Sequence, residues 1–175
     1  MTALNFAAAL TTIGDWTIIR LPQDISDQLP SRGQVMVNGT MNGAVFQSPL
    51  EPDGDGGHWF KVEAELQAAA GVAAGDTATL TLEATKEWPE PAVPGDFSSL
   101  LANNADLQAL WQSLTPKARW EWLRWIGSTK QAQTRARRIQ VAASKLRAGE
   151  RRPCCFNQSM CCVPEVSSNG VLLAQ

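Results

Sequence analysis

The chain has 175 residues, of which 44% are hydrophobic and 18% are charged, and its formal net charge is −2. This composition is typical of a globular protein with one ordinary domain or two small ones, and it excludes a disordered chain. No apolar run approaches the roughly 20 residues that a membrane span needs, and the first residues lack the basic segment of a secretory signal. We therefore expect a cytoplasmic protein without a membrane span.

The charge is distributed unevenly along the chain. Residues 1–100 hold 4 Lys and Arg against 13 Asp and Glu, a net charge of −9, whereas residues 101–175 hold 11 against 4, a net charge of +7. Such a split predicts two units with different surfaces. Docking of the two units on each other explains it most simply, and an external anionic partner is the alternative.

The first half of the sequence shows the period-two alternation of strands with one buried face. The segments that fit this pattern are residues 4–10, 15–21, 35–41, 43–50, 59–64 and 77–85. In the fifth segment, Trp59, Lys61 and Glu63 are expected on the solvent face. Short helices are expected at residues 22–29 and 65–70. Six short strands in so short a stretch predict a small closed β-barrel, which leaves few free strand edges.

Several residues of the first half have local structural roles in this interpretation. Asn42-Gly43 predicts a hairpin turn, and Gly75-Asp76 predicts a turn in which the Asp76 side chain accepts hydrogen bonds from backbone amides. His58 is the only histidine, and its parity with Phe60 places it inside as a structural residue. A nucleophile, a base and oxyanion donors cannot be assembled from these residues, so an enzyme is the least supported class.

The second half changes to helical spacing after a proline-rich connector at residues 87–97. Helices are predicted within residues 98–114, at 116–126 and at 129–146, and Thr115 is expected to cap the helix that begins at Pro116. The predicted buried stripe of this helix consists of Ala118, Trp122, Trp125 and Ile126. Trp120 falls on the opposite side with Arg124, where it would stack on a ligand or, as we favour, pack against the barrel.

The last predicted helix is basic. Its expected apolar face consists of Ala132, Ala136, Ile139, Ala143 and Leu146, and its basic residues are Lys130, Arg135, Arg137, Arg138 and Lys145. Such a stripe can bind phosphates of a nucleic acid. A solvated helix face, or one that matches the acidic barrel, is favoured over nucleic acid because the sequence pI is only about 5.4.

The stretches "GDWTIIRLP", "VNGTMNGAVFQSPLEPDGDGGHWFKV", "AGVAAGDTATLTLE" and "LTPKARWEWLRWIGSTKQAQTRARRI" occur in this order. Together they resemble the bacterial bacteriocin-protection, YdeI/OmpD-associated family over about residues 4–150. The strongest matches are Gly75-Asp76 and the residues Thr134-Arg135 and Arg138-Ile139. The resemblance implies a small closed barrel of unknown function followed by helices, a role in protection against antimicrobial peptides, and no established enzyme activity.

All four cysteines lie in "RRPCCFNQSMCCVPEV", as Cys154-Cys155 and Cys161-Cys162. Four thiolates can hold tetrahedral Zn²⁺, and soft sulfur also suits Cu(I). The Cys-Cys-x₅-Cys-Cys spacing, however, differs from the Cys-x₂-Cys pairs of zinc ribbons. Reactive thiols and ordinary buried or tail cysteines are the alternatives. The last is favoured, so no cofactor is expected.

The sequence therefore predicts an α+β protein with a small closed six-stranded β-barrel at residues 1–86 and a Pro-rich linker at 87–96. A helical YdeI/OmpD-associated-like module follows at 97–149, and a Cys-containing tail at 150–175. The leading hypothesis is a non-enzymatic cytoplasmic binding or stress-protection protein that holds a peptide or small ligand between barrel and helices. The candidate ligand-binding residues are Trp120, Arg124, Lys130, Arg135 and Arg138. Metal handling by the tail and nucleic-acid binding by the basic helix are the alternatives.

Overall fold

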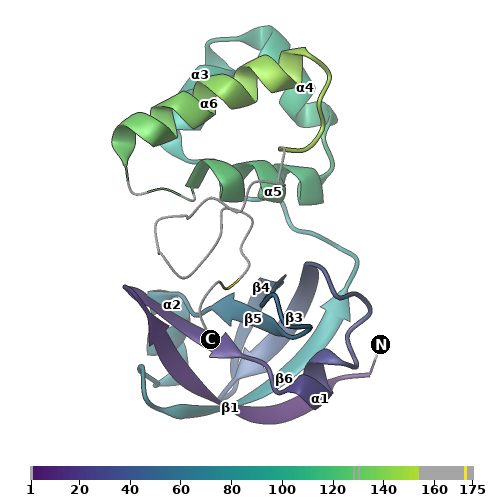
Figure 1. Ribbon diagram of the computed structural model, residues 1–175, viewed down its shortest axis with the longest axis vertical. Helices are drawn as coiled ribbons and strands as arrows, with labels where there is room; N and C mark the ends of the chain where they lie inside the picture. Colours follow the sequence, from purple (N-terminus) through teal and green to yellow (C-terminus); the bar gives the residue numbers. More distant parts are fainter. Residues whose placement is uncertain (1, 128, 130, 154–171, 173–175) are drawn as a thin grey trace. The chain divides into compact units, whose positions relative to one another are not determined.

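The computed structural model describes residues 2–127, 129, 131–153 and 172 (Figure 1). The described residues form two compact units, one built from residues 2–87 with Leu172 and the other from residues 88–153. We call them the barrel unit and the helical unit. The α+β fold class predicted from the sequence is confirmed, because a closed antiparallel β-barrel is followed by helices.

Six strands form the barrel (Figure 1). They are β1 (Leu4–Ile13), β2 (Trp16–Arg20), β3 (Val35–Met41), β4 (Ala44–Pro52), β5 (His58–Lys61) and β6 (Thr77–Thr85). Every neighbouring pair is antiparallel, and the order around the barrel is β1-β2-β5-β4-β3-β6, with β6 paired back to β1. The short helices α1 (Gln23–Ser26) and α2 (Ala64–Ala70) interrupt the strands.

The inward residues of the predicted strands form one apolar core, and the predicted alternation of buried and exposed residues is confirmed in β1 and β6. The most deeply buried members include Leu10, Ile19, Val37, Met41, Leu50, Phe60, Leu80 and Leu82. The prediction is wrong for Trp59, which is only 3% exposed. Its ring stacks on that of Trp16 with the centroids 6.3 Å apart, so a second aromatic side chain covers the outer face of β5 there. The fifth strand also ends earlier than predicted, since Ala64 begins α2.

The predicted turn residues take structural roles. Asn42 and Gly43 have φ angles of 47° and 86°, as a two-residue hairpin turn with both central residues left-handed requires, and they join β3 to β4. At the second turn, the Asp76 carboxylate accepts a hydrogen bond from the Ala73 amide at 2.8 Å. His58 is fully buried and makes a 3.0 Å hydrogen bond through Nε2 to the carbonyl oxygen of Gly33. A carbonyl can only accept a hydrogen bond, so Nε2 carries the proton. The ring therefore links the start of β5 to the segment before β3.

The helical unit contains α3 (Gly95–Ala102), α4 (Ala105–Ser113), α5 (Pro116–Gly127) and α6 (Ala132–Arg147). Its core includes Phe97, Leu101, Leu107, Trp111, Trp122, Ile126, Ile139 and Leu146. The predicted cap is confirmed, because the Ala118 amide donates to the Thr115 hydroxyl at 3.2 Å. No helix among the described residues is both long and apolar enough to cross a bilayer.

The basic helix α6 differs from its prediction at its N-terminal end. It begins at Ala132 rather than near residue 129, and both Ala132 and Ala136 are exposed. Its buried face consists of Ile139, Ala142, Ala143 and Leu146. The first two turns carry no large apolar side chain whose burial would hold them against the core. Only the later part of the predicted apolar face is therefore buried.

Candidate functional site

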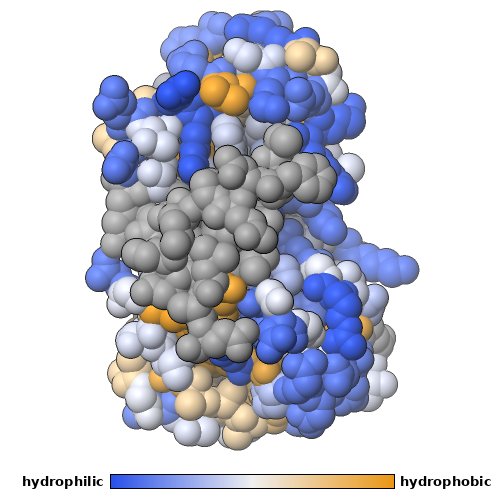
Figure 2. Space-filling view, viewed as in Figure 1, coloured by the Kyte–Doolittle hydropathy of each residue, from blue (hydrophilic) through white to orange (hydrophobic). Residues whose placement is uncertain are grey.

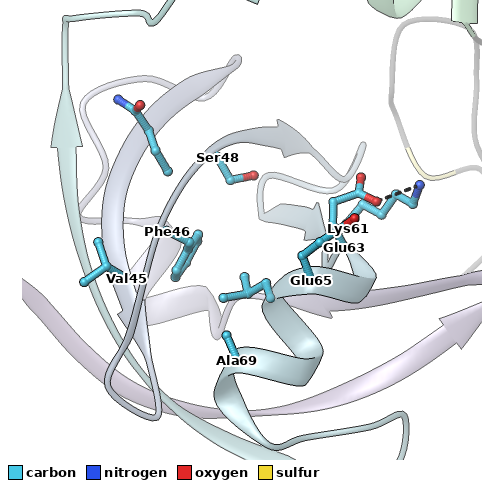
Figure 3. A pocket seen from close by; sticks show the side chains of 9 residues that line it. Val45, Phe46, Ser48, Lys61, Glu63, Glu65 and Ala69 are labelled. Carbon is cyan, nitrogen blue, oxygen red and sulfur yellow. Dashed lines mark ion pairs between the residues drawn. The ribbon is translucent and has the colours of Figure 1, made fainter. Parts of the chain in front are cut away.

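A groove of about 380 Å³ opens on the barrel unit between β4 and α2 (Figure 3). From β4 it is lined by Val45, Phe46, Gln47 and Ser48. From β5, α2 and the turn between them it is lined by Lys61, Glu63, Glu65, Leu66 and Ala69. We call it the β4–α2 groove. Its volume lies at the lower end of the range of protein pockets that hold small ligands.

The groove exists because the ladder between β4 and β5 is short. Strand β4 pairs with β3 from Met41↔Ala44 to Val35↔Leu50, but it pairs with β5 only through Glu51 and Pro52. The residue before Glu51 that faces β5 is Pro49, and proline has no amide hydrogen to donate to a ladder. The chain then leaves β5 after Lys61 and enters α2 at Ala64. Strand β4 and the segment that follows β5 therefore diverge, and they leave an open seam between them.

The base of the β4–α2 groove is apolar. Phe46 is half-buried and points into the groove (Figure 3), and its ring stacks on Phe60 with the centroids 5.5 Å apart. Leu66 is also half-buried and packs against the barrel core. Val45 is a large hydrophobic residue that is 84% exposed. On the face shown in Figure 2, the most hydrophobic residues reach the surface in small groups. An exposed valine beside an apolar base suits the burial of apolar ligand groups.

The polar side of the groove is acidic on balance. Lys61 pairs with Glu63, with 3.3 Å between Nζ and the carboxylate, as the dashed line in Figure 3 shows. The Lys61 ammonium also lies 5.2 Å from the centre of the Trp16 ring. Glu65 is exposed, and no cation in the described part of the chain pairs with it. One lysine between two glutamates leaves a net negative charge, which favours cationic ligands.

Trp120, the first predicted ligand-binding residue, contacts the connector of its own unit. Its indole N–H donates a 2.8 Å hydrogen bond to the carbonyl oxygen of Pro89, and its ring packs edge-on against Trp88 with the centroids 6.3 Å apart. Lys117 lies 5.5 Å from the Trp88 ring centre. These contacts fix the Pro-rich segment along α5, so Trp120 serves the fold of the helical unit.

The predicted arginines are also engaged within the helical unit. Arg135 donates two hydrogen bonds to Asp96 at the start of α3, at 2.6 and 3.0 Å. Arg138 donates to the carbonyl oxygen of Trp125 at 2.8 Å, and its guanidinium lies 5.5 Å from the Trp125 ring centre. Arg124 is half-buried on α5. The structure thus brings Arg138 onto the last turn of α5 and Arg135 onto α3.

The electrostatics of the helical unit follow from these pairs. Hydrogen bonds from Arg135 lower the pKa of Asp96, and the same contact raises the pKa of Arg135. Arg147 likewise binds Asp106 at 2.7 Å and lowers the pKa of that carboxyl. Lys145 pairs with Glu150 at 3.0 Å. The sequence suggested that the acidic barrel would match the basic helix, whereas these carboxylates belong to the helical unit itself.

Part of the predicted site lies outside the described residues. This holds for Lys130 and for the candidate metal ligands Cys154, Cys155, Cys161 and Cys162. Among the residues that the structure describes, no group of three or more His, Cys, Asp or Glu side chains could hold a metal ion.

Sequence reasoning missed the β4–α2 groove. The signal that could have indicated it is Pro49, which interrupts an otherwise regular strand after the Asn42-Gly43 hairpin. Val45 on the same strand was an equally visible apolar residue. Neither residue discloses that α2 borders the open seam, because this depends on the path of the chain after β5.

Comparison with known protein families supports the resemblance seen in the sequence. A small closed antiparallel barrel joined to a helical unit is the class that the fold defines. Residues 6–82 match a domain of unknown function (DUF1905), and residues 90–149 match the family described as "Bacteriocin-protection, YdeI or OmpD-Associated". The helical unit therefore matches the YdeI/OmpD-associated family, and the barrel unit matches a domain of unknown function. No curated protein matches the chain.

Proposed function

We propose that the protein is a non-enzymatic cytoplasmic binding protein that captures peptides in the β4–α2 groove of its barrel unit. The observation that carries this proposal is the groove itself, with its apolar base at Phe46 and Leu66 and the exposed Val45 beside it. The sequence-based hypothesis set the ligand between barrel and helices, whereas this groove is built from the barrel unit alone.

The family description supports a peptide as the ligand. It names protection against bacteriocins, which are antibacterial peptides and proteins. A protein can protect by sequestering such a molecule, without breaking any of its bonds. The exposed Glu65 carboxylate at the groove suits a cationic group of such a peptide.

The proposal is tested by filling the groove from α2. Ala69 is exposed and lines the groove, so the indole of Ala69→Trp would occupy it without disturbing the core. Ala68 precedes it on α2 and is also exposed but does not line the groove, so Ala68→Trp is the matched control. The probe is a short, capped, dye-labelled peptide in which valine and lysine alternate, and the readout is fluorescence anisotropy.

We expect Ala69→Trp to weaken peptide binding about tenfold or more, since losing the buried contacts of one side chain costs on the order of 1–3 kcal/mol. Ala68→Trp should bind like the unaltered protein. The proposal is wrong if the peptide does not bind, or if both variants bind it with the original affinity.

A second proposal concerns the cysteine tail, where four thiols within nine residues equal the number of ligands of a tetrahedral Zn²⁺ site and suit Cu(I) as well. Metal content and free thiols would be measured on protein purified under reducing, chelator-free conditions. One metal ion per chain, lost when Cys155 and Cys161 are both replaced by serine, would support the site. Four freely reacting thiols and no metal would contradict it.

Nucleic-acid binding by α6 is less well supported. Arg135, Arg147 and Lys145 each pair with a carboxylate of the helical unit, and this reduces the positive charge that phosphates would meet. A gel-retardation assay at low salt tests the hypothesis. Failure to retard any DNA or RNA would exclude it.

A further inference from the structure

We propose that the peptide binds the β4–α2 groove as an added β-strand on the open edge of β4, through the main-chain groups of Val45 and Gln47. We further propose that the captured segment is basic. This inference rests on the proposed function, because it specifies how the same groove holds its peptide.

The register of the β3–β4 hairpin shows which main-chain groups face the groove. The two-residue turn closes at the pair Met41↔Ala44. Such a turn makes this a hydrogen-bonded pair, and hydrogen-bonded and non-hydrogen-bonded pairs alternate along an antiparallel ladder. Ala44, Phe46 and Ser48 therefore exchange hydrogen bonds with β3, while Val45 and Gln47 direct their N–H and C=O groups to the other side.

Two further observations support this parity. Pro49 belongs to the same outward series as Val45 and Gln47, and a proline is tolerated in a strand only where its missing N–H is not needed by the ladder. Further along, Asp53 has the same parity, and its amide donates to the carbonyl oxygen of Gly57 at 3.1 Å, next to the start of β5. The odd-numbered residues of β4 thus face the β5 side throughout.

Within the part of the chain that the structure describes, no strand of the barrel pairs with the edge of β4 at Val45 and Gln47. Strand β5 reaches only Glu51 and Pro52, and no described strand pairs with the outward groups nearer the hairpin. A closed barrel normally has no free edge, so this seam is where the closure of the sheet is incomplete. Val45, Gln47 and the carbonyl of Pro49 thus present outward main-chain groups at every second residue. An extended peptide pairs with such groups when it adds to a sheet as a further strand.

The surroundings indicate the chemistry of the added strand. Its side chains alternate, so one set would contact the apolar base at Phe46 and Leu66. Glu65 has no cationic partner in the described part of the chain, and residues 1–100 carry a net charge of −9. Basic side chains on the peptide would complement this charge, and acidic ones would be repelled.

The test uses backbone methylation of the probe peptide in which valine and lysine alternate. In an added strand, the N–H groups of alternate peptide residues bond to β4. N-methylation of the residue type whose N–H groups face β4 removes these hydrogen bonds, whereas N-methylation of the other residue type does not. We expect one methylated peptide to bind about tenfold or more weakly and the other to keep an affinity close to the original. A control peptide with glutamate in place of lysine should bind at least tenfold more weakly.

A protein variant tests the same contact from β4. Gln47→Pro removes an N–H that faces the groove and is not used by β3, whereas Gln47→Ala removes only the side chain. Gln47→Pro should weaken binding severalfold relative to Gln47→Ala, which measures the contribution of the side chain alone. Circular dichroism of both variants shows that the barrel is intact.

The possible failures are distinguishable. If both methylated peptides bind equally well, strand addition is wrong, and the proposed function survives provided that Ala69→Trp still blocks binding. Equal binding of the lysine and glutamate peptides overturns the preference for a basic segment. If no peptide binds, or if Ala69→Trp has no effect, both the inference and the proposed function fail.

Discussion

Gly39 lies in the middle of β3, where its neighbours leave no room for a β-carbon. A Cβ there would lie 2.5 Å from the carbonyl oxygen of Thr81, 2.7 Å from Leu82 and 3.2 Å from the Phe46 ring. The bare backbone lets the Phe46 ring lie over the strand, which helps to form the base of the β4–α2 groove. Gly39 therefore links the packing of the barrel to the candidate site.

We predict that Gly39→Ala lowers the free energy of unfolding by about 1–3 kcal/mol, because the backbone oxygen of Thr81 cannot yield without disturbing the sheet. Chemical denaturation measures the change. Gly33→Ala is the control, since the nearest atom to its β-carbon is the Ser31 hydroxyl at 3.5 Å. Equal stability of the two variants would contradict the packing account.

The Asp96–Arg135 pair predicts a pH dependence. Hydrogen bonds from Arg135 hold the pKa of Asp96 below its ordinary value of 3.8. A carboxyl with a lowered folded-state pKa stabilises the protein above its unfolded pKa and loses this contribution as the pH falls through the folded-state value. The carboxylate side chain is 44% exposed, so solvent screening limits the contribution to about 0.5–1 kcal/mol.

We therefore expect Asp96→Asn to lower the free energy of unfolding by this small amount at pH 7. The difference from the unaltered protein should shrink as the pH falls below about 3.8. Denaturant unfolding of both proteins across this range measures it, and Arg135→Gln should show the same trend. A difference that stays constant on acidification would mean that the charge of Asp96 is not its cause.

Thr115 shows what a single cap does for a whole element. Its hydroxyl accepts the Ala118 amide at the start of α5, the helix that carries the buried Trp122 and Ile126. We predict that Thr115→Ala lowers the free energy of unfolding by about 1 kcal/mol. Thr115→Ser keeps the accepting oxygen and should retain most of the stability. If serine and alanine destabilise equally in denaturant unfolding, the hydroxyl is not the stabilising group.

The elements could be predicted where local chemistry determines them. Period-two alternation located β1, β3 and β6, Asn42-Gly43 located the hairpin, and Thr115-Pro116 located the start of α5. The prediction is wrong where a residue distant in the sequence determines whether a side chain is buried. Trp59 is buried because Trp16 covers it from β2, and alternation within β5 carries no information about that ring.

At the scale of the molecule, composition and charge predicted two units, and each of the units has its own apolar cluster. The candidate site could not be predicted in the same way. It depends on Pro49 ending one ladder and on α2 following β5, and these two features lie apart in the sequence. Arg135 and Arg138, which the sequence predicts as ligand contacts, bind groups inside the helical unit in this structure.

The central claim is that the β4–α2 groove of the barrel unit binds the peptide. The most direct measurement is a titration of ¹⁵N-labelled full-length protein with the valine–lysine peptide, followed by amide chemical shifts. We predict that the largest shifts occur at the amides of Val45, Gln47 and Leu66. Shifts concentrated at Trp120, Arg135 and Arg138, or no shifts at all, would contradict the claim.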